Sequence, residues 1–97
     1  MTPNDQRELA RLLATLRREC RQQSGLEARL TPPDKETAYR VARMVEEELG
    51  LAVAGWKIAA MKEEMQRQLR TDAPIYGRVY ESHIRPTPVS VEFTKQC

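Results

Sequence analysis

The sequence predicts a small α+β fold in which helices come first and short strands follow. Apolar residues recur every three or four positions through the first half of the chain, a spacing typical of amphipathic helices. Beyond residue 50, β-prone runs are separated by segments that contain turn-forming residues such as Asp72, Pro74 and Gly77. With 97 residues, the chain is expected to form a single small domain over 1–97 with one thin core.

The composition narrows the classes of protein that fit. Hydrophobic residues make up 40% of the chain but aromatic ones only 5%, so the core must depend on aliphatic side chains. The 16 basic and 14 acidic residues are interleaved, which argues against nucleic acid as a partner. No apolar stretch has the length of a membrane span and no signal peptide is visible, so we expect a cytoplasmic protein that binds no membrane.

The first helix is expected at about 3–23. Thr2 can cap it, Pro3 suits its first position, and Ser24-Gly25 is expected to end it. Its expected buried stripe consists of Leu9, Leu12, Leu13, Leu16 and Cys20. Cys20 and Cys97 lie too far apart for a paired zinc site, and two free thiols are favoured over a disulfide between them.

The second helix is expected at about 34–49, with Asp34 as its cap and Gly50 as its end. Its expected buried stripe consists of Ala38, Val41, Ala42, Val45 and Leu49. Glu46-Glu47-Glu48 cannot converge on one metal ion, because successive helical residues point about 100° apart. These three glutamates are expected to be solvated.

Beyond Gly50 the elements become shorter. Strands are expected at about 52–58, 78–81 and 89–94, the last from the alternation of Val89, Val91 and Phe93. A third helix is expected at about 62–69, where Met61, Met65 and Leu69 recur at helical spacing.

Two polar residues are the candidates for chemistry. Lys57, between Trp56 and Ile58, could bind a carboxylate or enolate oxygen, although a lysine on the exposed face of a strand is the simpler interpretation. Asp72 precedes Ala73-Pro74, where its side chain would by default close a turn. The only histidine, His83, is expected to be a surface residue. No metal-ligand spacing, nucleophile motif or phosphate-binding loop is visible.

Several blocks together resemble a known family. They are, in order, Ala38-Tyr39-Arg40-Val41-Ala42, Gly55-Trp56-Lys57-Ile58-Ala59-Ala60, Met65-Gln66-Arg67-Gln68-Leu69 and Asp72-Ala73-Pro74 followed by Gly77. Over roughly 34–79 the chain resembles the N-terminal domain of the 2-keto-4-pentenoate hydratase and oxalocrotonate decarboxylase group, within the fumarylacetoacetate-hydrolase-like family. It departs from the pattern at Arg70, where a glycine is common, at Ala42, where a glutamine is common, and at Met61-Lys62, which replaces a Thr/Ser-rich turn.

The resemblance implies a metal-dependent hydratase or decarboxylase of aromatic meta-cleavage degradation, acting on 2-keto acids or 2-hydroxydienoates. It implies that Lys57 faces the oxygens of the substrate and that Asp72 helps to place a proton or a water molecule. Magnesium or manganese would be held by a Glu-x-Glu pair and a third acidic residue in a C-terminal β-rich domain. No Glu-x-Glu follows Gly77, so this chain is expected to hold no cofactor itself.

The leading hypothesis is therefore a partial chain of such an enzyme, inactive in isolation, with a homo-oligomer expected. The alternative is a stand-alone, non-catalytic α+β interaction or oligomerisation domain, which would bury the strand at 89–94 against another chain. A nucleic-acid-binding basic helix is a weaker third hypothesis.

Overall fold

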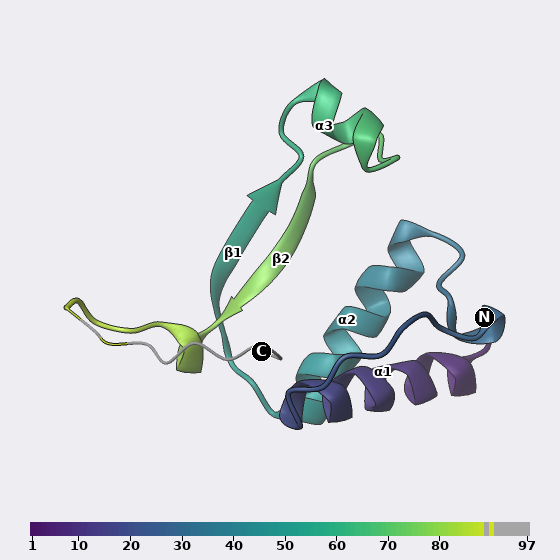
Figure 1. The fold of residues 1–97 in the computed structure, drawn as a ribbon, viewed down its shortest axis with the longest axis horizontal. Coiled ribbons are helices and arrows are strands. Elements are labelled where there is room, and N and C mark those ends of the chain that lie inside the picture. The colour runs from purple at the N-terminus through teal and green to yellow at the C-terminus, as the bar shows by residue number, and fades with distance from the viewer. Residues whose placement is uncertain (89, 91–97) are drawn as a thin grey trace. The chain divides into compact units, whose positions relative to one another are not determined.

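The computed structural model describes residues 1–88 and 90, and it has an α+β fold with helices first and a two-stranded antiparallel sheet after them (Figure 1). These residues form two compact units. We call Met1–Gly50 the helical unit and the described part of the second unit, Leu51–Pro88, the sheet unit. The predicted strand at 89–94 falls, apart from Ser90, outside the described residues.

Helix α1, Pro3–Arg18, begins as predicted and ends earlier than predicted. The Thr2 hydroxyl accepts a hydrogen bond from the Asp5 amide at 3.0 Å, and the Asp5 carboxylate accepts one from the Thr2 amide, which makes a capping box. Cys20 is left-handed at φ 50°, and the Arg21 amide donates to the Leu16 carbonyl at 2.9 Å. This Schellman motif ends the helix, so the predicted end at Ser24-Gly25 was wrong.

Helix α2, Lys35–Leu49, confirms both of its predicted ends. The Asp34 carboxylate accepts a hydrogen bond from the Thr37 amide at 2.7 Å, so Asp34 is the N-cap. Gly50 ends the helix in the left-handed conformation, at φ 65°. Between α1 and α2 lies a short 3₁₀ helix, η1 (Ala28–Leu30), which brings Leu30 into the core.

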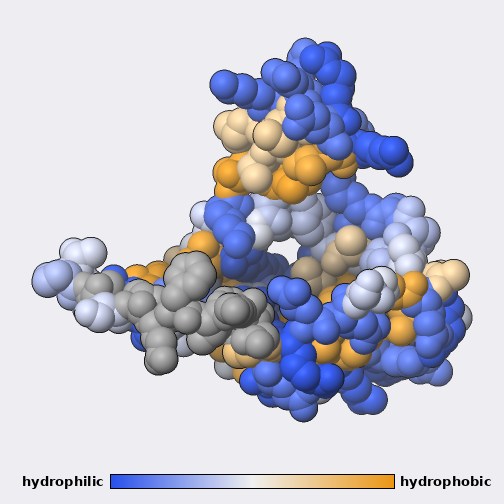
Figure 2. Space-filling view, viewed as in Figure 1, coloured by the Kyte–Doolittle hydropathy of each residue, from blue (hydrophilic) through white to orange (hydrophobic). Residues whose placement is uncertain are grey.

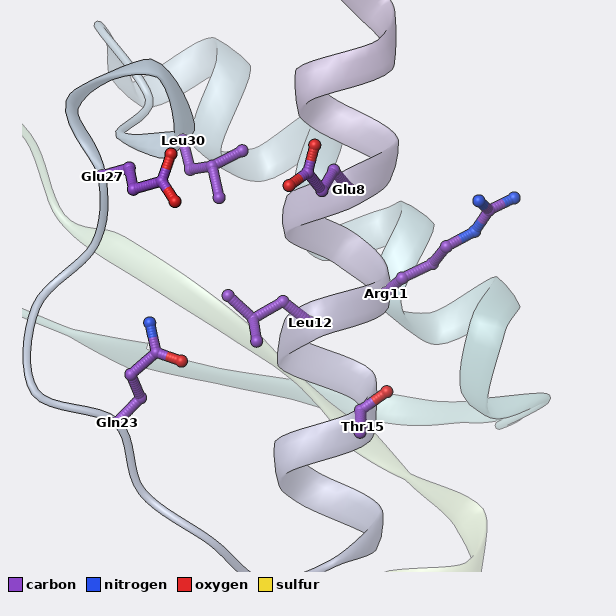
Figure 3. A pocket seen from close by; sticks show the side chains of 7 residues that line it. All are labelled: Glu8, Arg11, Leu12, Thr15, Gln23, Glu27 and Leu30. Atoms are coloured by element: carbon purple, nitrogen blue, oxygen red, sulfur yellow. The ribbon is translucent and has the colours of Figure 1, made fainter.

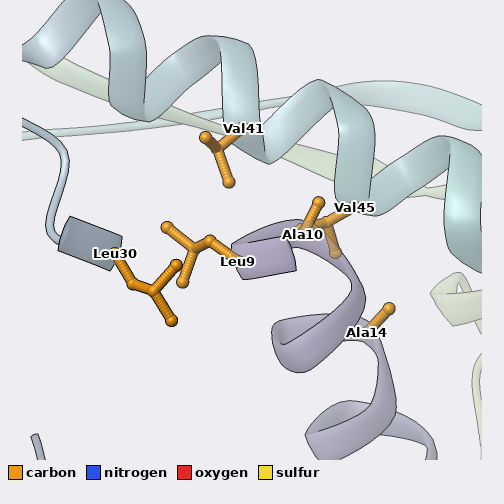
Figure 4. Close-up of a cluster of buried hydrophobic side chains, with 6 residues drawn as sticks. All are labelled: Leu9, Ala10, Ala14, Leu30, Val41 and Val45. Carbon is orange, nitrogen blue, oxygen red and sulfur yellow. The ribbon is translucent and has the colours of Figure 1, made fainter. Parts of the chain in front are cut away.

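The core of the helical unit forms where α1, α2 and η1 meet (Figure 4). It contains Leu9, Ala10, Ala14, Leu30, Val41 and Val45. Leu9 and Leu30 face each other below Val41, and the small side chains of Ala10 and Ala14 line the side of α1 that is completely buried. The predicted stripes were therefore wrong in part: Leu13, Ala38 and Ala42 are exposed, because the contact between the helices follows the alanines of α1.

Two other predictions for the helical unit were wrong. Cys20 is disulfide-bonded, not a free thiol, while the other cysteine of the chain, Cys97, lies outside the described residues. Glu46 is buried, whereas Glu47 and Glu48 are exposed as expected. Glu46 directly follows Val45 and falls on the packed side of α2, which the sequence pattern of three adjacent glutamates did not indicate.

The sheet unit is built on strands β1 (Val53–Ala59) and β2 (Ile75–Tyr80), joined through helix α3 (Glu63–Gln68). Each strand extends closer to α3 than predicted: β2 begins three residues before the predicted 78, directly after Pro74. The register pairs Lys57 with Gly77 and Ala59 with Ile75, with an irregularity between Val53 and Gly55. A 3₁₀ turn, η2 (Glu81–His83), follows β2.

Helix α3 ends in the same way as α1. Arg70 is left-handed at φ 55°, its amide donates to the Arg67 carbonyl at 3.2 Å, and the Thr71 amide donates to the Gln66 carbonyl at 2.9 Å. These two hydrogen bonds form a Schellman motif in which Arg70 occupies the position that glycine usually takes. A residue with a side chain is strained there, because its Cβ approaches the backbone closely.

The sheet unit has very little core. Only Ala60 and Tyr80 are buried among its described hydrophobic residues. Its exposed large hydrophobic residues are Val53, Trp56, Ile58, Met61, Met65, Leu69, Tyr76 and Ile84. In the upper part of Figure 2, where Figure 1 has α3 and the adjoining strand ends, hydrophobic residues form a surface band next to strongly hydrophilic ones.

Candidate functional site

The candidate site lies on the β1–β2 strand pair, around Lys57. Because side chains alternate along a strand, Lys57 shares one face of the pair with Gly55 and Ala59, and its cross-strand partner on that face is Gly77. Lys57 is exposed. On this face, the two nearest residues of β1 and the direct partner on β2 are thus small, and the lysine is the one long polar side chain among these four.

The Lys57 side chain lies across the sheet over Gly77. A Cβ atom built on Gly77 would come within 2.9 Å of Cε, 3.5 Å of Cγ and 3.8 Å of Cδ of Lys57. Three carbons of the lysine stem therefore follow the surface that Gly77 leaves open. The ammonium group is carried from β1 toward β2 and remains in contact with solvent, where an anion can reach it.

Asp72 lies in the loop between α3 and β2 and is exposed. The loop is held by the Thr71 hydroxyl, which donates to the Ala73 carbonyl at 3.0 Å. Both candidate residues thus belong to the sheet unit. They lie on different elements: Lys57 is in the middle of β1, while Asp72 is three residues before β2 begins.

The opposite face of the strand pair carries aromatic side chains. Trp56 and Tyr76 meet edge to face with their ring centroids 5.5 Å apart, and the Arg78 guanidinium lies 5.0 Å from the Trp56 ring. Trp56, Ile58 and Tyr76 line a shallow apolar pocket of about 300 Å³. Because Trp56 and Lys57 are consecutive in β1, this pocket is on the other face from the lysine.

A second pocket, of about 470 Å³, belongs to the helical unit (Figure 3). Gln23 and Glu27 on the loop face Leu12 of α1 across it, while Arg11 points away. Arg29 binds Glu8 through two hydrogen bonds of 2.6 and 2.7 Å and Glu27 through one of 3.0 Å. Arg29 thus already binds both carboxylates that line this pocket.

Three carboxylates of the helical unit have lowered pKa values. Hydrogen bonds from Thr2, with a smaller contribution from Arg29, lower the pKa of Asp5, and the hydrogen bonds from Arg29 lower the pKa of Glu8. The Thr37 amide lowers the pKa of Asp34. Each of these shifts has a structural cause, a helix cap or the ion pairs of Arg29, so they report stability and do not identify an active site.

Metal-binding residues do not come together in the part of the chain that the structure describes: no three His, Cys, Asp or Glu side chains there could hold an ion. His83 is exposed, as predicted, with its ring against Tyr80 at a centroid distance of 5.6 Å. None of the helices within residues 1–88 is both long and apolar enough to cross a membrane.

The sequence indicated Lys57, but it did not indicate its cross-strand partner Gly77 or the aromatic side chains on the opposite face of the strand pair. The pairing of Lys57 with Gly77 depends on the register of two strands that are separated by α3. The aromatic face was missed as well, although the alternation of Trp56 with Ile58 and of Tyr76 with Arg78 is a period-two signal that could have indicated it.

Comparison with known proteins adds no relative: the chain matches no family model, no curated protein and no solved structure.

Proposed function

We propose that this chain is the N-terminal part of a metal-dependent 2-keto-4-pentenoate hydratase-like enzyme of the fumarylacetoacetate-hydrolase-like family. In this proposal it supplies one wall of the active site and is inactive alone. Lys57 binds the anionic oxygens of a 2-keto acid or 2-hydroxydienoate, and Asp72 helps to place the proton or water molecule. A cytoplasmic location in the degradation of aromatic compounds is part of the same proposal.

The observation that carries this proposal is the pairing of Lys57 with Gly77. The two residues come from separate blocks of the family resemblance, the one around Gly55–Ala60 and the one that begins at Asp72. The strand register joins these blocks, and the lysine stem lies over the glycine. A lysine that lies over a glycine on the neighbouring strand would give both blocks a shared structural role, and this supports the proposal.

A second observation supports the proposal at a place where the sequence departs from the family pattern. Arg70 stands where that pattern has a glycine, and its backbone is left-handed at φ 55°. Glycine is the residue that this conformation favours. A left-handed backbone at the position where the family pattern has a glycine therefore supports the proposal.

The chemistry assigned to Lys57 follows from its charge and its exposure. Addition of water to a 2-keto-alkenoate passes through an enolate, and a nearby ammonium stabilises negative charge that develops on its oxygens. The described residues do not fit a magnesium or manganese site. The proposal therefore assigns the metal to the C-terminal β-rich domain of the enzyme and derives no step through it from this chain.

A chimaeric enzyme tests the proposal. Residues 34–79 would replace the matching segment of a full-length 2-keto-4-pentenoate hydratase, and hydration of 2-hydroxypenta-2,4-dienoate would be followed with magnesium present. We expect turnover, and we expect Lys57→Ala to lower it at least tenfold. Lys62→Ala is the matched control, because Lys62 is an exposed lysine that makes no side-chain cap to α3.

Two results would contradict the proposal. One is a folded chimaera, verified by circular dichroism, without magnesium-dependent hydration. The other is equal turnover for Lys57→Ala and Lys62→Ala, which would remove the assigned role of Lys57.

The second candidate function is a non-catalytic interaction or oligomerisation domain. The exposed aromatic face favours it, since Trp56 is 56% and Ile58 63% exposed and a two-stranded sheet is marginally stable without a covering surface. We would measure the molar mass of the full chain by light scattering at several concentrations. Trp56→Ser should abolish association while Met65→Ser, on α3, should not; a monomer at all concentrations would exclude self-association.

A further inference from the structure

We infer that Gly77 is a positioning residue for Lys57. Because glycine has no side chain, the aliphatic part of the Lys57 side chain can cross the sheet directly over Gly77. The inference deepens the proposed function, on which its catalytic consequence rests. Its geometric part concerns the strand pair itself and can be tested separately.

The contact distances show that Gly77 has no room for a side chain while Lys57 keeps its present conformation. Its hypothetical Cβ would lie 2.9 Å from Cε of Lys57, a separation that real Cβ atoms do not tolerate. Gly55, on the same face of the sheet, has no atom within 4 Å of the same hypothetical position. An alanine in place of Gly77 would therefore displace the Lys57 side chain, whereas an alanine in place of Gly55 would displace no atom.

Backbone conformation does not explain the glycine. Gly25 and Gly50 have positive φ angles of 72° and 65°, whereas Gly77 has no positive φ and lies within β2. An alanine can adopt an extended strand backbone without strain. What a glycine uniquely provides at residue 77 is therefore room for the side chain on the neighbouring strand.

The consequence is a separation of stability from function. The atom that must move is near the far end of a flexible lysine side chain, not backbone, so the fold accommodates Gly77→Ala easily. The ammonium group, however, must leave its position over β2. A displacement of about 1 Å of a positioned group lowers a rate substantially, up to about 100-fold.

The geometric part can be tested on the full chain. Lysines would be labelled by reductive methylation with ¹³C-formaldehyde, and the signal of Lys57 would be identified by its loss in Lys57→Arg. Gly77→Ala should shift this signal and leave the signals of Lys35 and Lys62 unchanged. Gly55→Ala is the matched control and should shift none of them. An unshifted Lys57 signal in a folded Gly77→Ala protein, or equal shifts in both variants, would overturn the inference.

The catalytic part uses the chimaera and a double-mutant cycle. If Gly77 acts through Lys57, Gly77→Ala should lower kcat about tenfold or more when Lys57 is present and should have no further effect on Lys57→Ala. An equal loss in both backgrounds would mean a structural role and would overturn the positioning role. If Lys57→Ala alone changes nothing, the proposed function fails for Lys57, and the methylation spectrum still decides whether Gly77 positions the lysine.

Discussion

The helical unit and the sheet unit use their apolar residues in opposite ways. In the helical unit, Leu9, Leu30 and Val41 are at most 4% exposed and pack against one another. In the sheet unit, Trp56 and Ile58 are more than half exposed. The difference shows that the helical unit buries apolar side chains in a core of its own, while the sheet unit leaves large apolar side chains exposed, as it does the candidate site residues.

The polar groups follow the same division. The helical unit contains the capping box of α1, the Asp34 cap of α2 and the ion pairs of Arg29 with Glu8. In the sheet unit, α3 has no side-chain cap and ends at a strained Arg70. The side-chain caps of the two long helices thus lie in one unit, and the residues proposed to act on a substrate lie in the other, as expected if the scaffold and the site have separate requirements.

The largest expected effect comes from a cavity in the core of the helical unit. Leu9→Ala should lower its free energy of unfolding by about 2–5 kcal/mol, because Leu9 is 2% exposed and its neighbours cannot fill the space. Urea unfolding followed by circular dichroism at 222 nm measures this loss, since α1 and α2 contain most of the helical residues described.

The same experiment has an internal comparison. Leu13→Ala, on the same helix but 37% exposed, should cost less than half as much. Trp56, the single tryptophan, reports on unfolding of the sheet unit by fluorescence. In Leu9→Ala, the unfolding transition seen by fluorescence should shift much less than the one seen by circular dichroism, because the core that contains Leu9 lies within Met1–Gly50. Equal shifts of both signals would break the contrast between the units.

Helix ends should give intermediate effects of opposite sign in the two units. Gly50→Ala forces a side chain into φ 65° and should destabilise the helical unit by about 1–2 kcal/mol. Arg70→Gly relieves the same strain at φ 55° and should stabilise the sheet unit by about 1 kcal/mol. Thermal unfolding by circular dichroism and by Trp56 fluorescence would detect both; a destabilising Arg70→Gly would refute the strain at α3.

The smallest expected effect is a dependence on acid in the helical unit. Folding lowers the pKa of Asp34 below its usual value of 3.8 through the hydrogen bond from the Thr37 amide. The stabilisation by Asp34 is therefore complete above pH 3.8 and is lost as the pH falls through the lower folded pKa. Asp34→Asn keeps an oxygen acceptor that does not titrate, so its melting temperature should change less between pH 5 and 2 than that of the unsubstituted chain. Identical slopes would show that Asp34 makes no such contribution.

Much of the helical unit was predictable from short-range patterns. Thr2, Asp34 and Gly50 mark helix ends correctly because a cap involves residues only a few positions apart. The end of α1 was not predictable in this way, since Cys20 is an unusual residue for a left-handed position. The buried face of α1 was assigned wrongly in part: Leu9 is buried as predicted, but the spacing of the leucines did not indicate that Ala10 and Ala14 are buried with it.

Half of the candidate site was predictable. The sequence indicated Lys57 from its apolar neighbours and from the resemblance, but it could not indicate that Gly77 lies beneath the lysine stem. That relation depends on which residues of β1 and β2 face each other, and a shift of one residue would place the lysine on the other face.

By itself, the sequence of this protein determined the fold class, the number of long helices and the starting points of both, because these follow from local hydrogen bonding and from the spacing of apolar residues. Only the tertiary structure decided that Ala10 and Ala14 are buried while Leu13, Ala38 and Ala42 are exposed, that the sheet unit leaves its aromatic face exposed, and that Lys57 lies over Gly77. These features depend on contacts between residues distant in the chain, and the energy of such contacts is set by shape and register, which no local pattern contains.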